Sequence, residues 1–187
     1  MAIKSNPCKK CGSLFHTAAF CLKSARTPIR KPSKTLKVKK APVKKITHKK
    51  AKENAWKAFS IYIRTRDCLL TTGTTQQGKC ITCNVRGDRN PLVDFNKSQA
   101  GHAIGGRSNA ILFHEEIVNL QCGYCNQKPP IGLGGDYGNY AIALIERYGL
   151  DHYKYLQSLK GKELQYKTYE LVEIEQKYKD KTLELLT

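Results

Sequence analysis

The chain has 187 residues, which is enough for one compact domain with appendages but not for two large ones. Its formal net charge of +18 is uneven, because residues 1–52 hold 16 Lys/Arg and no Asp or Glu, whereas the other 135 residues hold 17 Lys/Arg and 15 acids. No apolar run could span a bilayer and no secretory signal opens the chain, so the sequence argues against a membrane protein and predicts an intracellular binder of polyanions such as nucleic acid.

A cysteine/histidine unit occupies residues 1–21. Its potential ligands are Cys8, Cys11, His16 and Cys21, separated by two, four and four residues. Three thiolates and one imidazole complete a tetrahedral zinc shell, and this order and spacing are those of a zinc knuckle in nucleic-acid-binding proteins. The sequence therefore predicts a first zinc site here.

Residues 22–50 form a Lys/Pro-rich segment that includes KPSKTLKVKKAPVKK. It holds too few apolar side chains to bury a core, so we expect a flexible basic linker that stays extended until it meets a partner. The lysines predicted to contact DNA phosphates are Lys37, Lys39, Lys40, Lys44 and Lys45.

The next segment, residues 51–66, predicts an amphipathic helix with apolar side chains at three- and four-residue intervals. Trp56 lies on the apolar face, and we interpret it as a core residue instead of a platform for a base. Residues 67–135 are rich in Gly, Asn, Cys and Pro, with strand-like pieces at 92–95 and 110–113. Such a segment cannot build a large core, so it is predicted to depend on a metal.

Two further helices are predicted towards the C-terminus. The pattern at 138–148 ends at Gly149, a residue typical of helix ends. The pattern at 162–186 is longer and has an apolar face suited to packing against another helix or a second copy of the chain. We therefore expect a metal-dependent domain over 51–150, a helical segment over 151–187 that is a possible dimerisation element, and a homodimer.

Two CxxC pairs are separated by 38 residues, Cys80 and Cys83 in the first and Cys122 and Cys125 in the second. Each pair can donate two thiolates, and together they close a structural Zn(Cys)4 site. Taken alone, this pattern is also found in zinc modules without catalytic activity. Cys68 is left over and is interpreted as a small buried hydrophobic residue.

The segments CITC, AGHAIGG and ILFHEEIVNLQCGYCNQK follow one another through this region. They resemble the zinc-stapled HNH nucleases, and the Asn that directly follows the last cysteine is similar to the arrangement of endonuclease VII-like junction resolvases. Over residues 54–150 the order of the pieces, from FSIYIRTRD to YAIALIERYG, resembles the phage NinG/Rap family of recombination nucleases. An N-terminal cysteine cluster followed by a basic segment has a counterpart in that family.

The resemblance implies a ββα-metal core that depends on Mg²⁺ or Mn²⁺ and cuts branched DNA, such as Holliday junctions or D-loops, in the cytoplasm of a bacterial host. It implies that His102 is the general base for water, that Asn119 orients this histidine or shapes the loop, and that Asn126 holds the catalytic cation. The base activates water while the cation stabilises charge on the phosphate and on the leaving oxygen.

One position departs from the usual HNH pattern, in which Asp or Glu precedes the base histidine and binds the cation. This chain has Gly101 there, so the second protein ligand must come from elsewhere. Glu115 is the first candidate and Asp94 the second, because Mg²⁺ prefers carboxylate oxygens. Lys128 follows the motif at a spacing suited to a phosphate contact, although a solvated lysine fits equally well.

The expected fold is therefore α+β, with a small ββα-metal core stapled by Zn(Cys)4, flanking helices, and a zinc knuckle on a flexible arm. The expected function is structure-selective cleavage of branched DNA. One alternative is a non-enzymatic protein that uses two zinc sites and the basic arm to bind nucleic acid. Another is an HNH enzyme that cuts duplex DNA at a specific sequence, although we identify no recognition helix or additional DNA-reading domain.

Overall fold

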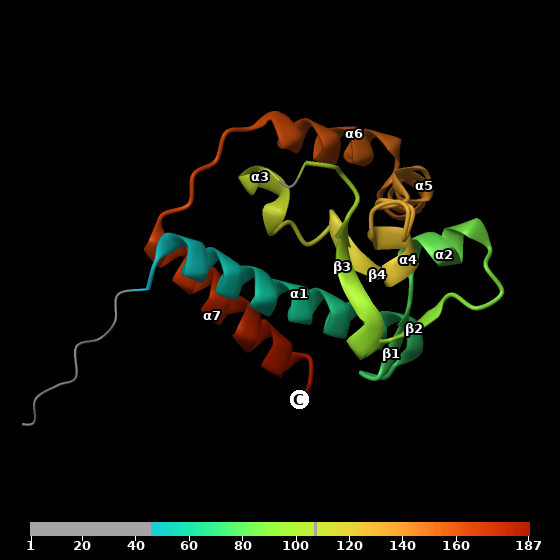
Figure 1. The fold of residues 1–187 in the computed structure, drawn as a ribbon, viewed down its shortest axis with the longest axis horizontal. Coiled ribbons are helices and arrows are strands. Elements are labelled where there is room, and N and C mark those ends of the chain that lie inside the picture. Colours follow the sequence, from blue (N-terminus) through green and yellow to red (C-terminus); the bar gives the residue numbers. More distant parts are fainter. Residues whose placement is uncertain (1–45, 107) are drawn as a thin grey trace, which may run out of the picture. The chain divides into compact units, whose positions relative to one another are not determined.

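Two long helices, α1 (His48–Thr72) and α7 (Thr168–Glu184), lie side by side along one side of the structure (Figure 1). This computed structural model describes residues 46–106 and 108–187, and none of the helices in those ranges is long and apolar enough to cross a membrane. Outside the described residues lie the predicted zinc-knuckle ligands and linker lysines, namely Cys8, Cys11, His16, Cys21, Lys37, Lys39, Lys40, Lys44 and Lys45.

Helix α1 extends beyond the predicted 51–66 at both ends. Thr47 caps its N-terminus, because the side-chain oxygen accepts a hydrogen bond from Lys50 N at 3.3 Å. Gly73 ends it with φ of 70°, a left-handed conformation that costs glycine little, and its N–H donates to Leu69 O at 2.9 Å. The end of the predicted linker, from residue 48 onwards, is therefore helical.

Part of the apolar face of α7 is covered by α1 of the same chain. Leu171 is 0% exposed and packs on Ala51 and Ala55, while the rings of Phe59 and Tyr178 meet edge to face at 4.7 Å. The predicted helix at 162–186 thus begins six residues later than expected, and only part of its apolar stripe is buried within the chain. Val172, Leu183 and Leu186 remain exposed, and the dimer stays a prediction.

Two small antiparallel sheets lie beside α1. Strand β1 (Gln77–Lys79) pairs with β2 (Leu92–Asp94), and β3 (Ser98–His102) pairs with β4 (Val118–Cys122). The strand predicted at 92–95 is confirmed over its first three residues, and Phe95 begins a 3-10 turn instead (Phe95–Lys97). The register of the second sheet places His102 opposite Val118.

The strand predicted at 110–113 is wrong. This segment forms the short helix α3 (Asn109–Leu112), in which Ile111 and Leu112 are buried. Four apolar residues in a row do not distinguish a strand from a buried helical turn. None of the strands in residues 46–106 and 108–187 pairs with this segment to select extended backbone. Packing of Ile111 into the core decides the conformation.

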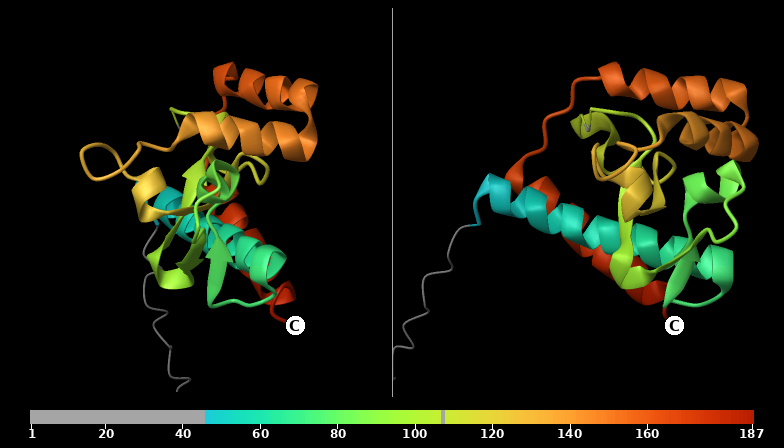
Figure 2. Two further views of the ribbon diagram at one scale, coloured as in Figure 1. Left: turned by 90° about the vertical axis from the view of Figure 1, so that its right-hand side faces the viewer. Right: turned by 45° about the vertical axis from the view of Figure 1, so that its right-hand side comes forward.

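Four further helices follow or flank the strands, and they are α2 (Ile81–Arg86), α4 (Gly123–Asn126), α5 (Tyr137–Tyr148) and α6 (Leu150–Ser158), with a 3-10 turn at Leu159–Gly161. Helix α5 confirms the prediction at 138–148 and stops at Gly149, from which α6 turns back beside it (Figure 2). Apart from its first residue, helix α6 falls within the predicted helical segment 151–187, in which no separate helix had been expected at these residues. The described residues form an α+β structure with two small antiparallel sheets.

Candidate functional site

The four cysteines of the two CxxC pairs come together. Their sulfur atoms all lie within 4.8 Å of one another, with Cys83 Sγ at 3.5 Å from Cys125 Sγ and 3.7 Å from Cys122 Sγ. A zinc ion bonded to four sulfurs at about 2.3 Å separates them by roughly 3.8 Å, so the spacing fits a tetrahedral site. The group can hold a metal such as zinc, and it ties α2 to the end of β4.

Arg86 compensates the negative charge that such a site carries. Its guanidinium donates to Cys83 Sγ at 3.5 Å and to Cys125 Sγ at 3.8 Å, and it is itself held by Asp88 and Asp136. Burial raises the pKa of the Cys83 thiol, and it raises that of Cys125 to about 11. The thiols of Cys83 and Cys125 therefore favour the protonated form until a cation binds, and binding releases their protons.

The hairpin β3–β4 leads from this cluster to His102. The residue before this histidine, Gly101, has no room for a side chain, because the Gln121 side chain fills that space. A Cβ at position 101 would lie 1.9 Å from Gln121 Oε1. Gln121 is fully buried and donates to Thr82 Oγ1 at 3.3 Å and to Gly135 O at 2.9 Å. An acidic residue at 101, the usual HNH pattern, would displace Gln121 and break these hydrogen bonds.

His102 lies at the end of β3 and is only 5% exposed. The Trp56 ring stacks on its imidazole, with centroids 5.1 Å apart and planes 17° apart. His102 Nε2 lies 3.3 Å from Leu112 O, and because a carbonyl only accepts, Nε2 carries the proton in this pair and Nδ1 carries the lone pair. Stacking and hydrogen bonding therefore fix both the ring orientation and the tautomer.

Asn126 joins His102 at one cavity of about 460 Å³. It ends α4, directly after the cluster ligand Cys125, and its Nδ2 donates to Gln99 Oε1 at 2.6 Å. That bond leaves the Asn126 Oδ1 atom available as a hard oxygen ligand. The exposed Lys128 lines the same cavity.

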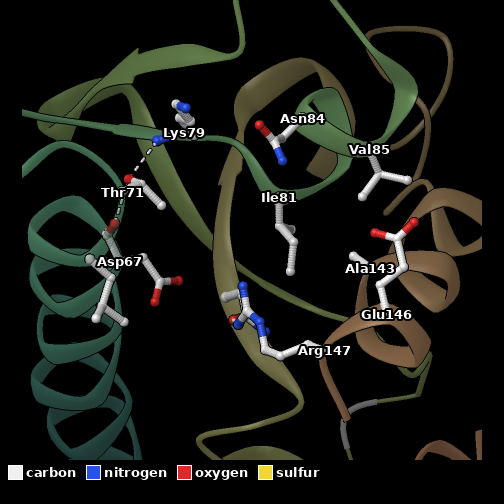
Figure 3. A pocket seen from close by; sticks show the side chains of 11 residues that line it. Asp67, Thr71, Lys79, Ile81, Asn84, Val85, Ala143, Glu146 and Arg147 are labelled. Atoms are coloured by element: carbon white, nitrogen blue, oxygen red, sulfur yellow. Dashed lines mark hydrogen bonds between the residues drawn. The ribbon is translucent and has the colours of Figure 1, made fainter. Parts of the chain in front are cut away.

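Asn119 does not join them. It pairs with Gly101 in the register, one residue from the His102–Val118 pair, so its side chain points to the opposite face of the sheet. There it is 1% exposed, accepts from Arg147 Nη1 at 2.8 Å and borders a second cavity of about 280 Å³. Figure 3 shows Arg147 reaching into this cavity from α5, opposite Asp67 on α1.

Neither carboxylate proposed as the second cation ligand lines the cavity of His102 and Asn126. Glu115 is bound by α1 and α7, through Tyr62 at 3.0 Å, Tyr178 at 3.2 Å and Lys181 at 2.6 Å. Burial opposes its ionisation, but these donors prevail and hold the pKa of Glu115 below its ordinary value. Asp94 lies on the exposed surface, where it pairs with Lys97 at 3.2 Å.

Several residues that build the site were not identified from the sequence. Gln99 and Gln121 are isolated amides without a spacing signal, and Arg86 looks like any charged residue at the end of a short helix. Trp56 packs against the core, as predicted, and is not an exposed platform for a base, but its contact with His102 was not predicted. Periodicity could not reveal these contacts, because each joins segments more than 20 residues apart in the chain.

No curated protein and no solved structure matches the chain significantly. A family model does match, over residues 21–187, and it is described as bacteriophage Lambda NinG protein. This range contains both CxxC pairs and the cavity of His102 and Asn126. The chain belongs to the bacteriophage Lambda NinG protein family.

Proposed function

We propose that the protein is a metal-dependent endonuclease that hydrolyses phosphodiester bonds in branched DNA. The observation that carries this proposal is the cavity shared by His102 and Asn126, immediately beside the cluster of four cysteines. The hairpin β3–β4 followed by the helical turn α4 has the strand–strand–helix order of the proposed ββα-metal core. Membership of a phage family supports a substrate among phage DNA intermediates.

The chemistry proposed for the cavity divides between two side chains and a cation. His102 accepts a proton from the water that attacks the phosphorus, and the carbonyl of Leu112 stabilises the charged ring through Nε2. Asn126 Oδ1 would hold Mg²⁺ or Mn²⁺ together with phosphate oxygens and water, a ligand set that Mg²⁺ accepts. The cation supplies charge stabilisation of the phosphate. Lys128 adds a positive charge at the cavity wall.

A second candidate function is nucleic-acid binding without catalysis. It is favoured by one observation: among the described residues, no Asp or Glu lines the cavity of His102 and Asn126. An enzyme with this cavity would hold its catalytic cation through a single protein oxygen and the oxygens of the substrate, whereas a protein that only binds nucleic acid needs no cation there. The cluster of four cysteines and the 16 basic residues in 1–52 serve either function.

A cleavage assay separates the two candidates. The full chain, loaded with zinc, is incubated with a four-way DNA junction and with a linear duplex of the same sequence, in Mg²⁺, Mn²⁺ or EDTA. We expect nicks in the junction with Mg²⁺ or Mn²⁺, none with EDTA, and much less product from the duplex. Tight binding without any nick in either divalent cation would leave the binder as the function. Equal cutting of the duplex at one site would instead indicate a sequence-specific enzyme.

Gln99 is predicted to position Asn126 for the cation. Gln99→Met removes the acceptor at 2.6 Å, so the Asn126 amide can turn its NH2 group towards the cation. We expect the Mg²⁺ concentration for half-maximal cleavage to rise about tenfold, the low end for loss of such a supporting contact. Gln99→Glu keeps an acceptor and should not raise that concentration. An unchanged Mg²⁺ dependence of Gln99→Met would remove Gln99 from this role.

A further inference from the structure

A second cleft lies on the other side of Asn126, which lines both it and the cavity of His102. Its volume is about 330 Å³. Helix α1 and strand β3 form its walls, and the remaining lining residues are Trp56, Ser60, Arg64, Ser98, Gln99 and Ala100. Because one residue borders both hollows, a chain-like ligand bound in the first would continue into the second.

Arg64 is the only charged side chain among the residues that line this cleft. Its guanidinium is half-buried and lies over the Phe95 ring, 4.4 Å from the centroid. Its hydrogen bonds run from Nε to Ser60 O at 3.2 Å and from Nη1 to Phe95 O at 3.1 Å and Ser98 O at 3.5 Å. All of these acceptors are neutral carbonyls, so they orient the guanidinium without compensating its charge.

Two other arginines, one on α1 and one beside the cysteine cluster, have acidic partners. Arg66 pairs with Asp67 at 2.7 Å, and Arg86 pairs with Asp136 at 2.8 Å. Within residues 46–106 and 108–187 no carboxylate lies within 4.0 Å of the Arg64 guanidinium. Burial accordingly lowers the pKa of Arg64. A partly desolvated cation without a counter-charge is costly for the fold alone, which points to an anionic ligand.

The geometry restricts what that anion can be. Arg64 Nη2 takes part in none of the hydrogen bonds above, so one nitrogen of the planar guanidinium remains for a ligand. A phosphate accepts from an arginine in this way, and most protein–DNA hydrogen bonds go to phosphates and sugars. An exposed lysine provides a diffuse charge, whereas a guanidinium fixed by three carbonyls provides a single position and hence a register.

We propose that Arg64 binds a phosphate of the DNA strand that is cut, one that flanks the scissile phosphate at His102 and Asn126. This proposal rests on the proposed nuclease function. It makes the second cleft a subsite that sets which bond of the strand reaches the cavity. Arg64 is thus a positioning residue and takes no part in the chemistry at phosphorus.

The test compares Arg64→Gln with Lys57→Gln, which removes one positive charge from the same helix. Lys57 is exposed and lines a different groove, between α1 and α7. Binding of a four-way junction is measured in EDTA over a range of salt concentrations. We expect Arg64→Gln to weaken binding about tenfold, as for loss of a charge-assisted hydrogen bond, and to reduce the salt slope by about 0.9. Lys57→Gln should change neither appreciably.

A second measurement locates the phosphate. Single methylphosphonates, which lack the phosphate charge, replace the phosphates around the branch point of the junction one at a time. One flanking position should weaken wild-type binding about tenfold and leave Arg64→Gln unaffected. Arg64→Lys, which keeps the charge if the glutamine variant fails to fold, should bind better than Arg64→Gln and shift or blur the cleavage position.

The outcomes separate the subsite from the nuclease. If Arg64→Gln and Lys57→Gln have the same affinity and salt slope, or if every methylphosphonate affects wild type and Arg64→Gln equally, Arg64 binds no phosphate. If the wild-type protein shows the Arg64-dependent position but never nicks the junction, the subsite stands as a DNA contact while the nuclease function fails.

Discussion

A His102→Ala protein is expected to lose cleavage of the four-way junction by a factor on the order of 10² or more, since general-base catalysis contributes about that much. The loss should appear in the rate at saturating Mg²⁺, because no step of cation binding is assigned to His102. Binding of the junction in EDTA should stay within a few-fold of wild type. Single-turnover cleavage with protein in excess measures the rate, and a filter or gel assay measures the affinity.

The matched control is His152→Ala. His152 pairs with Glu116 at 3.0 Å and lies outside the cavity, so its removal should leave the cleavage rate unchanged. His102→Ala also removes the stack on Trp56, and thermal unfolding of the variant must show that the fold persists. A folded His102→Ala protein that cleaves as fast as wild type would exclude His102 as the base.

The cysteine cluster is the part of the site that sequence predicts best. A CxxC pair fixes the separation of its own two sulfurs through the local backbone, so only the meeting of two pairs needs long-range information. The structure brings Cys80 and Cys83 to Cys122 and Cys125 across β3 and β4. Helix α5 could be predicted equally well, because the periodic spacing of its apolar residues and the glycine at its end are local signals.

The sheet face to which a side chain points could not be predicted from the sequence in the same way. Motif order places Asn119 between His102 and Asn126, yet the pleat of the sheet turns its side chain away to Arg66 and Arg147. The register depends on which residues pair across the hairpin, and that choice belongs to the tertiary packing. Asn119 therefore supports the hairpin from behind, through buried hydrogen bonds, instead of contacting His102.

The fate of Glu115 follows from the same limit. Its place in FHEE suggested a cation ligand, but the contacts of a carboxylate depend on which side chains the tertiary structure brings next to it. Tyr62, Tyr178 and Lys181 come from two helices whose pairing no local pattern encodes. The apolar stripe of α7 was visible in the sequence, whereas its partner, α1 of the same chain, was not. The pattern could not show which of its residues pack within the chain, as Leu171 does, and which stay exposed, as Leu183 does.

Removal of the cluster metal is expected to have the largest effect on stability. Zinc in small zinc-dependent domains contributes about 10–16 kcal/mol of binding free energy that is coupled to folding. Here it holds α2 against the end of β4, and through Gln121 and Thr82 it supports Gly101 and the adjacent His102. Cys83→Ser should therefore lower the melting temperature by at least about 10 °C, which corresponds to only some 4 kcal/mol in a chain of this size.

Metal analysis with two further variants tests the assignment. The predicted knuckle and the cluster together give two zinc ions per wild-type chain, so Cys83→Ser and Cys11→Ser should each retain one. Cys68→Ala is the matched control: Cys68 is buried but lies outside the cluster, and this variant should keep both. Brief EDTA treatment should stop cleavage before it melts the fold, because the catalytic cation has few protein ligands whereas the cluster metal has four. If native protein contains no zinc, or if Cys83→Ser keeps both its metal content and its melting temperature, the cluster is a set of buried thiols and the support it gives to His102 must come from packing alone.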